Sequence, residues 1–230
     1  MRRTGPFSAA MAALAIGIGG GCTKTPSEPP SASGVAVGTG GAAADVKSDG
    51  EFVHDIAIMN MAEIQLSRMA LYKAASPNIK SFAQKLIDDH NAAGDKLKGV
   101  SGQSMDWPAQ LDDKHRDLAD ELAKKQGAEF DRDYTEAMIK GHEDLAARLE
   151  SRLDVQSLAD WKTAAAGRTR TQALPDPKSE MRDVPLSPNK SDKELTTRIN
   201  QWAAETYPVV QKHLDTARAL ENAMKKRSTH

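Results

Sequence analysis

Four titratable residues interrupt apolar helical stripes in the sequence and are the residues best suited to chemistry. Each follows an apolar residue by four positions and precedes the next position of the same stripe by three. They are Glu63, His90, His142 and His213. Imidazole nitrogens and a carboxylate oxygen are common ligands of zinc, copper and iron. Each residue falls near the middle of its stripe, so level helices would bring all four into one layer.

Two kinds of site fit such a layer. The four side chains could bind one transition-metal ion, or they could form a closed hydrogen-bonded network that only fixes helix packing. A buried carboxylate and three imidazoles without partners would be costly, so both interpretations require the side chains to converge. Thioether groups near the stripes also leave copper(I) open. These belong to Met59, Met61, Met69 and Met138.

Metal-bound histidines usually donate their second ring N–H to a nearby acceptor. Asp89 precedes His90 and Glu143 follows His142, while Tyr134 lies two turns before His142 on the same stripe. We therefore expect Asp89, Tyr134 and Glu143 to surround the four central residues. The other two histidines nearby, His54 and His115, are expected to be peripheral.

Four long amphipathic segments must position these residues. The first is expected to begin at Ser48 with a Ser48–Glu51 capping box, and the second at Ser76–Pro77, ending at Gly99. The third covers about 129–153. The fourth is expected to begin at Ser191 with a capping box to Glu194, and to be kinked at Pro208. Its stripe is expected to include Val209 and Thr216.

The fold class indicated by these segments is all-α. Aromatic residues make up only 4% of the chain, which disfavours a β-sandwich. The 100–128 connection contains a short amphipathic helix and is long enough to cross the bundle. The sequence thus predicts a ferritin-like four-helix bundle over 51–228. Between the third and fourth segments, the first third of 155–190 could be helical, and its Pro-rich remainder is expected to be a long exposed loop.

The N-terminal residues indicate export. Residues 1–21 combine Arg2 and Arg3 with a short apolar run, which is typical of a signal peptide. Cys22 follows at the position of the acylated cysteine in bacterial lipoproteins. Residues 22–50 are rich in Pro, Ser and Gly, and are expected to form a flexible linker. We expect a periplasmic protein anchored to the outer membrane through a lipid on Cys22.

Composition excludes several other classes of protein. A net charge of −1 argues against a nucleic-acid partner, and a single cysteine rules out an internal disulfide or a Cys-rich metal site. No catalytic triad, phosphate-binding loop or glycosidase carboxylate pair is apparent. An enzymatic function is therefore not expected from motifs.

Several short motifs resemble those of domain of unknown function 4142, a family described as ferritin-like and as exported or outer-membrane proteins. They are Phe52-Val53, Met61-Ala62-Glu63-Ile64, Ser76-Pro77, Phe82-Ala83-Gln84, Asp88-Asp89-His90, Phe130-Asp131, Tyr134, His142-Glu143 and His213-Leu214. The resemblance implies the fold and the export, and it supplies no activity.

True ferritins differ from this chain at their di-iron ligands, where a Glu precedes each His by three positions. Here those positions hold Ile87, Ile139 and Val210, so ferroxidase activity is not expected. Three functions remain open: a tethered metal-binding protein, a structural or stress-related envelope protein, and a redox enzyme of the ferritin-like class.

Overall fold

The structure is a computed structural model of the chain, and it describes residues 48–102, 105–169 and 185–227. These residues all belong to one compact unit, Ala42–His230. The signal peptide, Cys22 and almost all of the expected linker lie outside the described residues. Predictions about them therefore rest on sequence alone.

The described residues form six helices and no strand, which confirms the all-α class. In chain order the helices are α1 (Asp49–Lys73), α2 (Pro77–Ser101), α3 (Asp113–Ala123), α4 (Gly127–Glu150), α5 (Val155–Thr169) and α6 (Glu194–Arg227). None of these helices is both long enough and apolar enough to cross a lipid bilayer.

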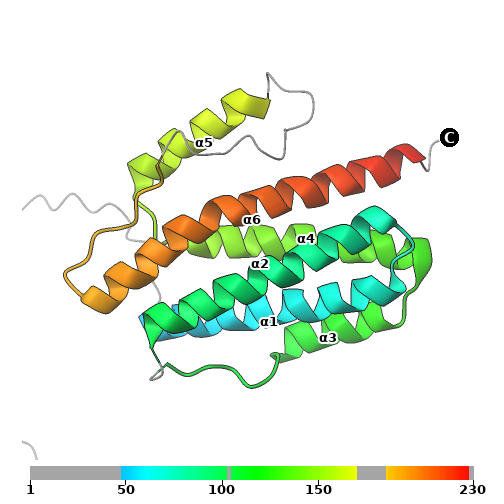
Figure 1. The fold of residues 1–230 in the computed structure, drawn as a ribbon, viewed down its shortest axis with the longest axis horizontal. Coiled ribbons are helices and arrows are strands. Elements are labelled where there is room, and N and C mark those ends of the chain that lie inside the picture. The colour runs from blue at the N-terminus through cyan, green and yellow to red at the C-terminus, as the bar shows by residue number, and fades with distance from the viewer. Residues whose placement is uncertain (1–47, 103–104, 170–184, 228–230) are drawn as a thin grey trace, which may run out of the picture. The chain divides into compact units, whose positions relative to one another are not determined.

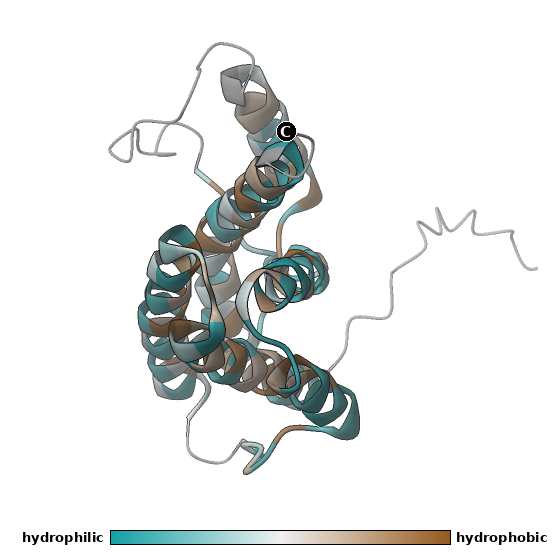
Figure 2. Cartoon of the chain, turned by 90° about the vertical axis from the view of Figure 1, so that its right-hand side faces the viewer, coloured by the Kyte–Doolittle hydropathy of each residue, from teal (hydrophilic) through white to brown (hydrophobic). Residues whose placement is uncertain are grey.

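The four long helices pack as a bundle, with α1 against α2 and α4, and α6 against the same two helices (Figure 1). The short helix α3 lies against α1 and α4. Hydrophobic residues turn toward neighbouring helices and hydrophilic residues cover the outer faces (Figure 2). This packing is consistent with the predicted helical bundle.

The helix starts agree with the sequence signals at α1 and α2. Ser48 Oγ accepts a hydrogen bond from the Glu51 backbone N–H at 3.3 Å, while Glu51 Oε2 accepts one from the Ser48 N–H at 3.0 Å. The expected capping box is thus confirmed. Pro77 opens α2, and Asp131 accepts hydrogen bonds from the Ala75 and Ser76 N–H groups, each at 2.9 Å.

Two helix boundaries were predicted wrongly. Gly99 lies within α2, which continues to Ser101 and ends at Gly102, whose φ of +82° suits glycine. The capping box predicted at Ser191 is absent, because α6 begins at Glu194. Ser191 Oγ instead accepts from the Lys193 N–H at 3.1 Å. Within α6 the helix continues through Pro208.

The apolar face of α6 also differs from the predicted stripe. Val209 is 41% exposed and Thr216 is exposed, whereas Val210, Leu214 and Ala217 are buried. On a buried helix face, successive apolar residues are three or four positions apart. The prediction placed Val209, three positions after Thr206, on the buried face, whereas the structure buries Val210, four positions after Thr206. His213 nevertheless lies on the buried face.

The 155–190 stretch is attached to the bundle at both ends. Trp161 of α5 is 3% exposed and contacts Tyr207 edge-on, with ring centroids 5.3 Å apart. At the other end of the stretch, just before α6, residues 187–189 pair with residues 152–154. The Asp154 N–H donates to the Ser187 carbonyl at 3.0 Å, and the Asn189 N–H donates to the Arg152 carbonyl at 2.9 Å. Residues 185–190 thus form an exposed or partly exposed loop, as expected, and these hydrogen bonds tie it to the bundle. Residues 170–184 lie outside the described residues.

A polar layer divides the hydrophobic core into two clusters. One cluster contains Met59 and Leu145, and the other contains Leu66 and Met138. Glu63 lies between Met59 and Leu66 along α1, and the three histidines occupy the equivalent junctions on α2, α4 and α6. The bundle thus places its buried titratable groups in the middle of an apolar core.

Candidate metal centre

The four predicted residues converge inside the bundle. Glu63 is 4% exposed and His90, His142 and His213 are 5%, 0% and 2% exposed. The three imidazole rings have centroids between 5.3 and 5.7 Å apart. One possible ligand nitrogen from each histidine lies within 4.8 Å of the other two. The predicted convergence is confirmed, and the group could hold a metal ion.

Glu63 lies against two of the three imidazoles. Its Oε2 atom is 2.8 Å from His90 Nε2 and 3.3 Å from His142 Nε2. Neither contact has hydrogen-bond geometry, and both carboxylate oxygens lack any hydrogen bond. The carboxylate therefore faces the imidazole nitrogens without being satisfied by them.

Each histidine uses its other ring nitrogen as a donor to an acceptor outside the cluster. His142 Nδ1 donates to the Met138 carbonyl at 2.9 Å, one turn earlier on α4. His213 Nε2 donates to Asp89 Oδ2 at 2.7 Å. Because a carbonyl and a carboxylate can only accept, these contacts place the hydrogen on the outer nitrogen.

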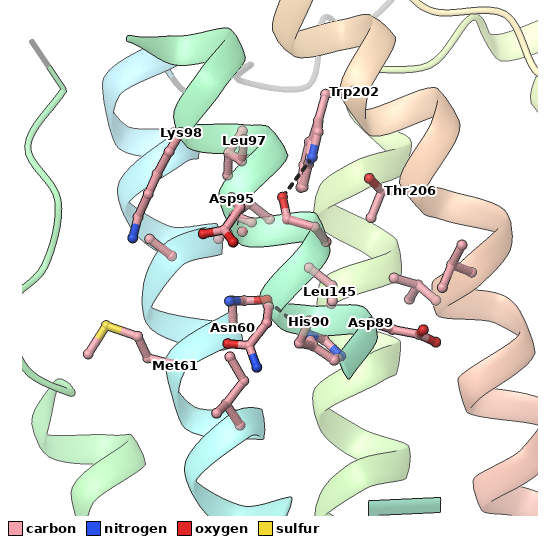
Figure 3. A pocket seen from close by; sticks show the side chains of 18 of the residues that line it. Asn60, Met61, Asp89, His90, Asp95, Leu97, Lys98, Leu145, Trp202 and Thr206 are labelled. Carbon is pink, nitrogen blue, oxygen red and sulfur yellow. Dashed lines mark hydrogen bonds between the residues drawn. The ribbon is translucent and has the colours of Figure 1, made fainter. Parts of the chain in front are cut away.

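The third histidine follows the same arrangement. His90 Nδ1 lies 2.9 Å from Asn60 Oδ1, to which it donates (Figure 3). The inner nitrogens of the neutral rings then carry lone pairs and no hydrogen. These atoms, which have no hydrogen-bond partner, are His90 Nε2, His142 Nε2 and His213 Nδ1. Acceptors at the outer nitrogens are the arrangement usual for metal-bound histidines.

Burial and the neighbouring charges shift the pKa values of Glu63, His142 and His213. Burial alone would raise the pKa of Glu63, but His142, His90 and His213 together hold it below its ordinary value. Burial lowers the pKa of His142, although Glu63 opposes that shift. Burial and the neighbouring His142 lower the pKa of His213 to about 4, against the opposing effect of Asp89.

The three surrounding residues expected from sequence have different roles. Asp89 accepts from His213 and also from Lys85 Nζ at 2.8 Å, so it holds the imidazole in place. Tyr134 is fully buried, but its hydroxyl bonds to Ser67 Oγ at 2.9 Å. Glu143 is exposed and accepts from Arg218 at 2.7 Å. Of the three, only Asp89 forms a hydrogen bond with a cluster histidine.

The remaining candidate residues lie away from the layer or serve it indirectly. His115 contacts Asp112 at the start of α3, and His54 contacts the Asp106 carbonyl, so both are peripheral as expected. The side chains of Met59 and Met138 belong to the two apolar clusters. Met138 contributes to the site through its backbone carbonyl.

Three supporting residues were missed by the sequence analysis. Asn60 orients His90 through a hydrogen bond. Gly94 leaves room for the Asn60 side chain, because a Cβ on Gly94 would lie 2.9 Å from Asn60 Nδ2. Similarly, a Cβ on Gly141 would lie 2.8 Å from Glu63 Oε1. Glycine inside a helix costs about 0.5–1 kcal/mol relative to alanine, so an isolated glycine in a helical pattern was the available signal.

The fold and the site define an all-helical protein with a buried group of three histidines and a glutamate. The chain belongs to the family described as Domain of unknown function (DUF4142), whose family model matches residues 36–172. The match includes Glu63, His90 and His142 and ends before α6 and His213. No curated protein and no solved structure matches the chain.

Proposed function

We propose that this protein binds one transition-metal ion between α1, α2, α4 and α6. The ligands are His90, His142 and His213, together with the Glu63 carboxylate. Zinc, copper and iron all accept this donor set. One observation carries the proposal: three buried imidazole nitrogens and a buried carboxylate, none with a hydrogen-bond partner, lie together in the core.

This arrangement favours a cation over a closed network. Because the outer nitrogens of the three imidazoles are the donors, their inner nitrogens and Glu63 are all acceptors, and acceptors cannot satisfy one another. A positive ion between them would convert mutual repulsion into coordination. Tetrahedral bonds of roughly 2.0–2.1 Å place ligand nitrogens about 3.4 Å apart. The three nitrogens lie within 4.8 Å of one another, so they would have to approach by up to about 1.4 Å on binding an ion.

Metal analysis of protein purified without a histidine tag tests the proposal. We expect one equivalent of metal in the wild type and none in His90→Ala or His142→Ala. His115→Ala is the matched control, since this histidine lies on α3 and pairs with Asp112. If neither the purified protein nor the metal-free protein takes up zinc, copper or iron, the proposal is wrong.

A second candidate function follows from the 2.8 Å contact between His90 and Glu63. A proton on His90 Nε2 would make this contact an ion pair, and the layer would then fix helix packing in a structural envelope protein. In that case the metal titrations detect no binding. His90→Ala then lowers the free energy of unfolding by roughly 1–3 kcal/mol, because Glu63 loses its partner.

The proposed location is the periplasm, with the protein anchored to the outer membrane through a lipid on Cys22. The signal-like residues 1–21, the position of Cys22 and the Pro/Ser/Gly-rich residues 22–50 support it. Cys22→Ser should move the protein from the membrane fraction to the soluble periplasmic fraction. Retention of the variant in the membrane fraction would argue against the lipid anchor.

The proposed bundle topology is ferritin-like. The long connection from α2 to α4, which carries α3, supports it, as does the packing of α1 and α6 against both α2 and α4. The ligand set differs from that of ferritins, because α2, α4 and α6 each supply a histidine without a glutamate three residues earlier. We therefore propose a site for a single ion and no ferroxidase chemistry.

A further inference from the structure

A cavity of about 440 Å³ reaches the histidine layer from one side. Its walls come mainly from α1, α2 and α6, and His90, His213 and Asp89 are among the residues that line it. Figure 3 shows Asn60 beside His90, and Asp89 on the side of α2 that faces α6. Glu63 and His142 do not line the cavity, so the layer meets it through two of its three histidines.

The contact between the cavity and the layer is narrow. His90 and His213 keep only 5% and 2% of their surface exposed. A ligand that reached them would have to present a donor only a few atoms in size. The cavity is also lined by Trp202 and Thr206, and its volume leaves room for such a molecule to approach.

The charge of the layer indicates which donor suits it. Three neutral imidazoles add no charge, and Glu63 supplies one negative charge, so a bound divalent ion would keep one positive charge. Asp89 is already engaged by His213 and Lys85. A small anion would therefore complete the charge balance, provided that one coordination position stays open toward the cavity.

We infer that the cavity admits a small anionic donor to an open coordination position on the ion. This inference rests on the proposed metal site and extends it from holding an ion to binding a second ligand. With three histidines and Glu63 as ligands the ion has four protein donors, so the anion would add a fifth, an expansion that zinc sites also make. That fifth position would lie on the side of the ion nearest the cavity, which His90 and His213 line.

Azide binding to the copper(II)-loaded protein tests the inference, because a copper–azide bond produces a new charge-transfer absorption band. We expect a saturable band in the wild type. Val209 lines the cavity, is 41% exposed and lies one turn before His213. Val209→Trp should therefore block the approach and weaken azide binding at least tenfold, with copper content unchanged. Thr216→Trp, on the exposed face of α6, is the matched control and should leave binding unchanged.

A second blocking variant keeps the test decisive if Val209→Trp fails to fold. Thr206 lines the same cavity, so Thr206→Trp should fill part of it and should also weaken azide binding. Failure of the wild type to take up copper, zinc or iron would defeat the proposed function itself. Copper binding without an azide band, or equal azide affinity in both tryptophan variants and the wild type, would overturn only the present inference.

Discussion

Gly141→Ala is the substitution that tests the position of Glu63 most directly. A Cβ at position 141 would lie 2.8 Å from Glu63 Oε1, so the carboxylate would have to move away from α4. In the metal-loaded protein that movement pulls the carboxylate away from the bound ion, and with a protonated His90 it lengthens the Oε2–Nε2 contact, which is 2.8 Å in the structure. Hydrogen bonds and contacts to charged groups are worth about 1.5–3 kcal/mol.

The opposing effect is the helix propensity of alanine, which stabilises a helix interior by about 1 kcal/mol relative to glycine. The net result expected for Gly141→Ala is a loss of about 0.5–2 kcal/mol in the free energy of unfolding. For a protein of this size, about 1 kcal/mol corresponds to roughly 2–4 °C in melting temperature. Melting of Gly141→Ala should therefore occur about 1–8 °C below that of the wild type.

Gly99→Ala is the matched control, because Gly99 also lies within a long helix and a Cβ there would meet nothing within 4 Å. This control should melt about 1–4 °C above the wild type. Thermal unfolding followed by circular dichroism at fixed metal content measures both variants. In a Glu63→Ala background, Gly141→Ala should become stabilising, since no carboxylate is left to displace. The reasoning is refuted if Gly141→Ala stabilises the wild-type protein as much as Gly99→Ala does.

Four further predictions concern the rest of the molecule. The pKa of His213 is about 4 when folded and about 6.5 when unfolded, so the unfolded chain binds its proton first. The metal-free protein should therefore be most stable above about pH 6.5 and lose up to about 3 kcal/mol by pH 4 in urea titrations. Asp89→Asn should weaken metal binding about 10–100-fold in a competition assay, while Asp88→Asn, on an exposed face, should leave it unchanged. Trp161→Ala should cost about 3–5 kcal/mol in chemical unfolding if α5 is part of the folded core. Limited proteolysis should cut first within 170–184, and early cleavage inside α5 would contradict the packing of Trp161.

Periodicity predicted the histidine layer because the spacing of titratable residues within an apolar stripe is fixed by helix geometry alone. Glu63 and the three histidines are related to their neighbours by steps of three and four, and those steps do not depend on how the helices meet. The same reasoning placed Val209 inside and Val210 outside, since both satisfy the spacing locally. Only packing against α2 and α4 decides between them.

Features that depend on contacts between helices could not be predicted from the sequence. Asn60 could be read as an ordinary polar residue on α1, and nothing in its spacing shows that it faces His90. Gly94 and Gly141 were visible as isolated glycines in helical patterns, but their purpose emerges only when Asn60 and Glu63 occupy the adjacent space. Ser191 illustrates the opposite error, a valid local capping signal that the chain does not use.

The order of the ligands along the chain has a consequence for biosynthesis. Glu63, His90 and His142 belong to helices that emerge early from the ribosome, whereas His213 belongs to the last helix. Domains generally fold as whole units, with the N-terminal parts synthesised first. The cluster therefore cannot be complete until the C-terminal helix has been made and has docked. A chain truncated before α6 would keep three of the four side chains and leave one flank of the layer open to water, so an ion could be held by all four ligands only after α6 has docked.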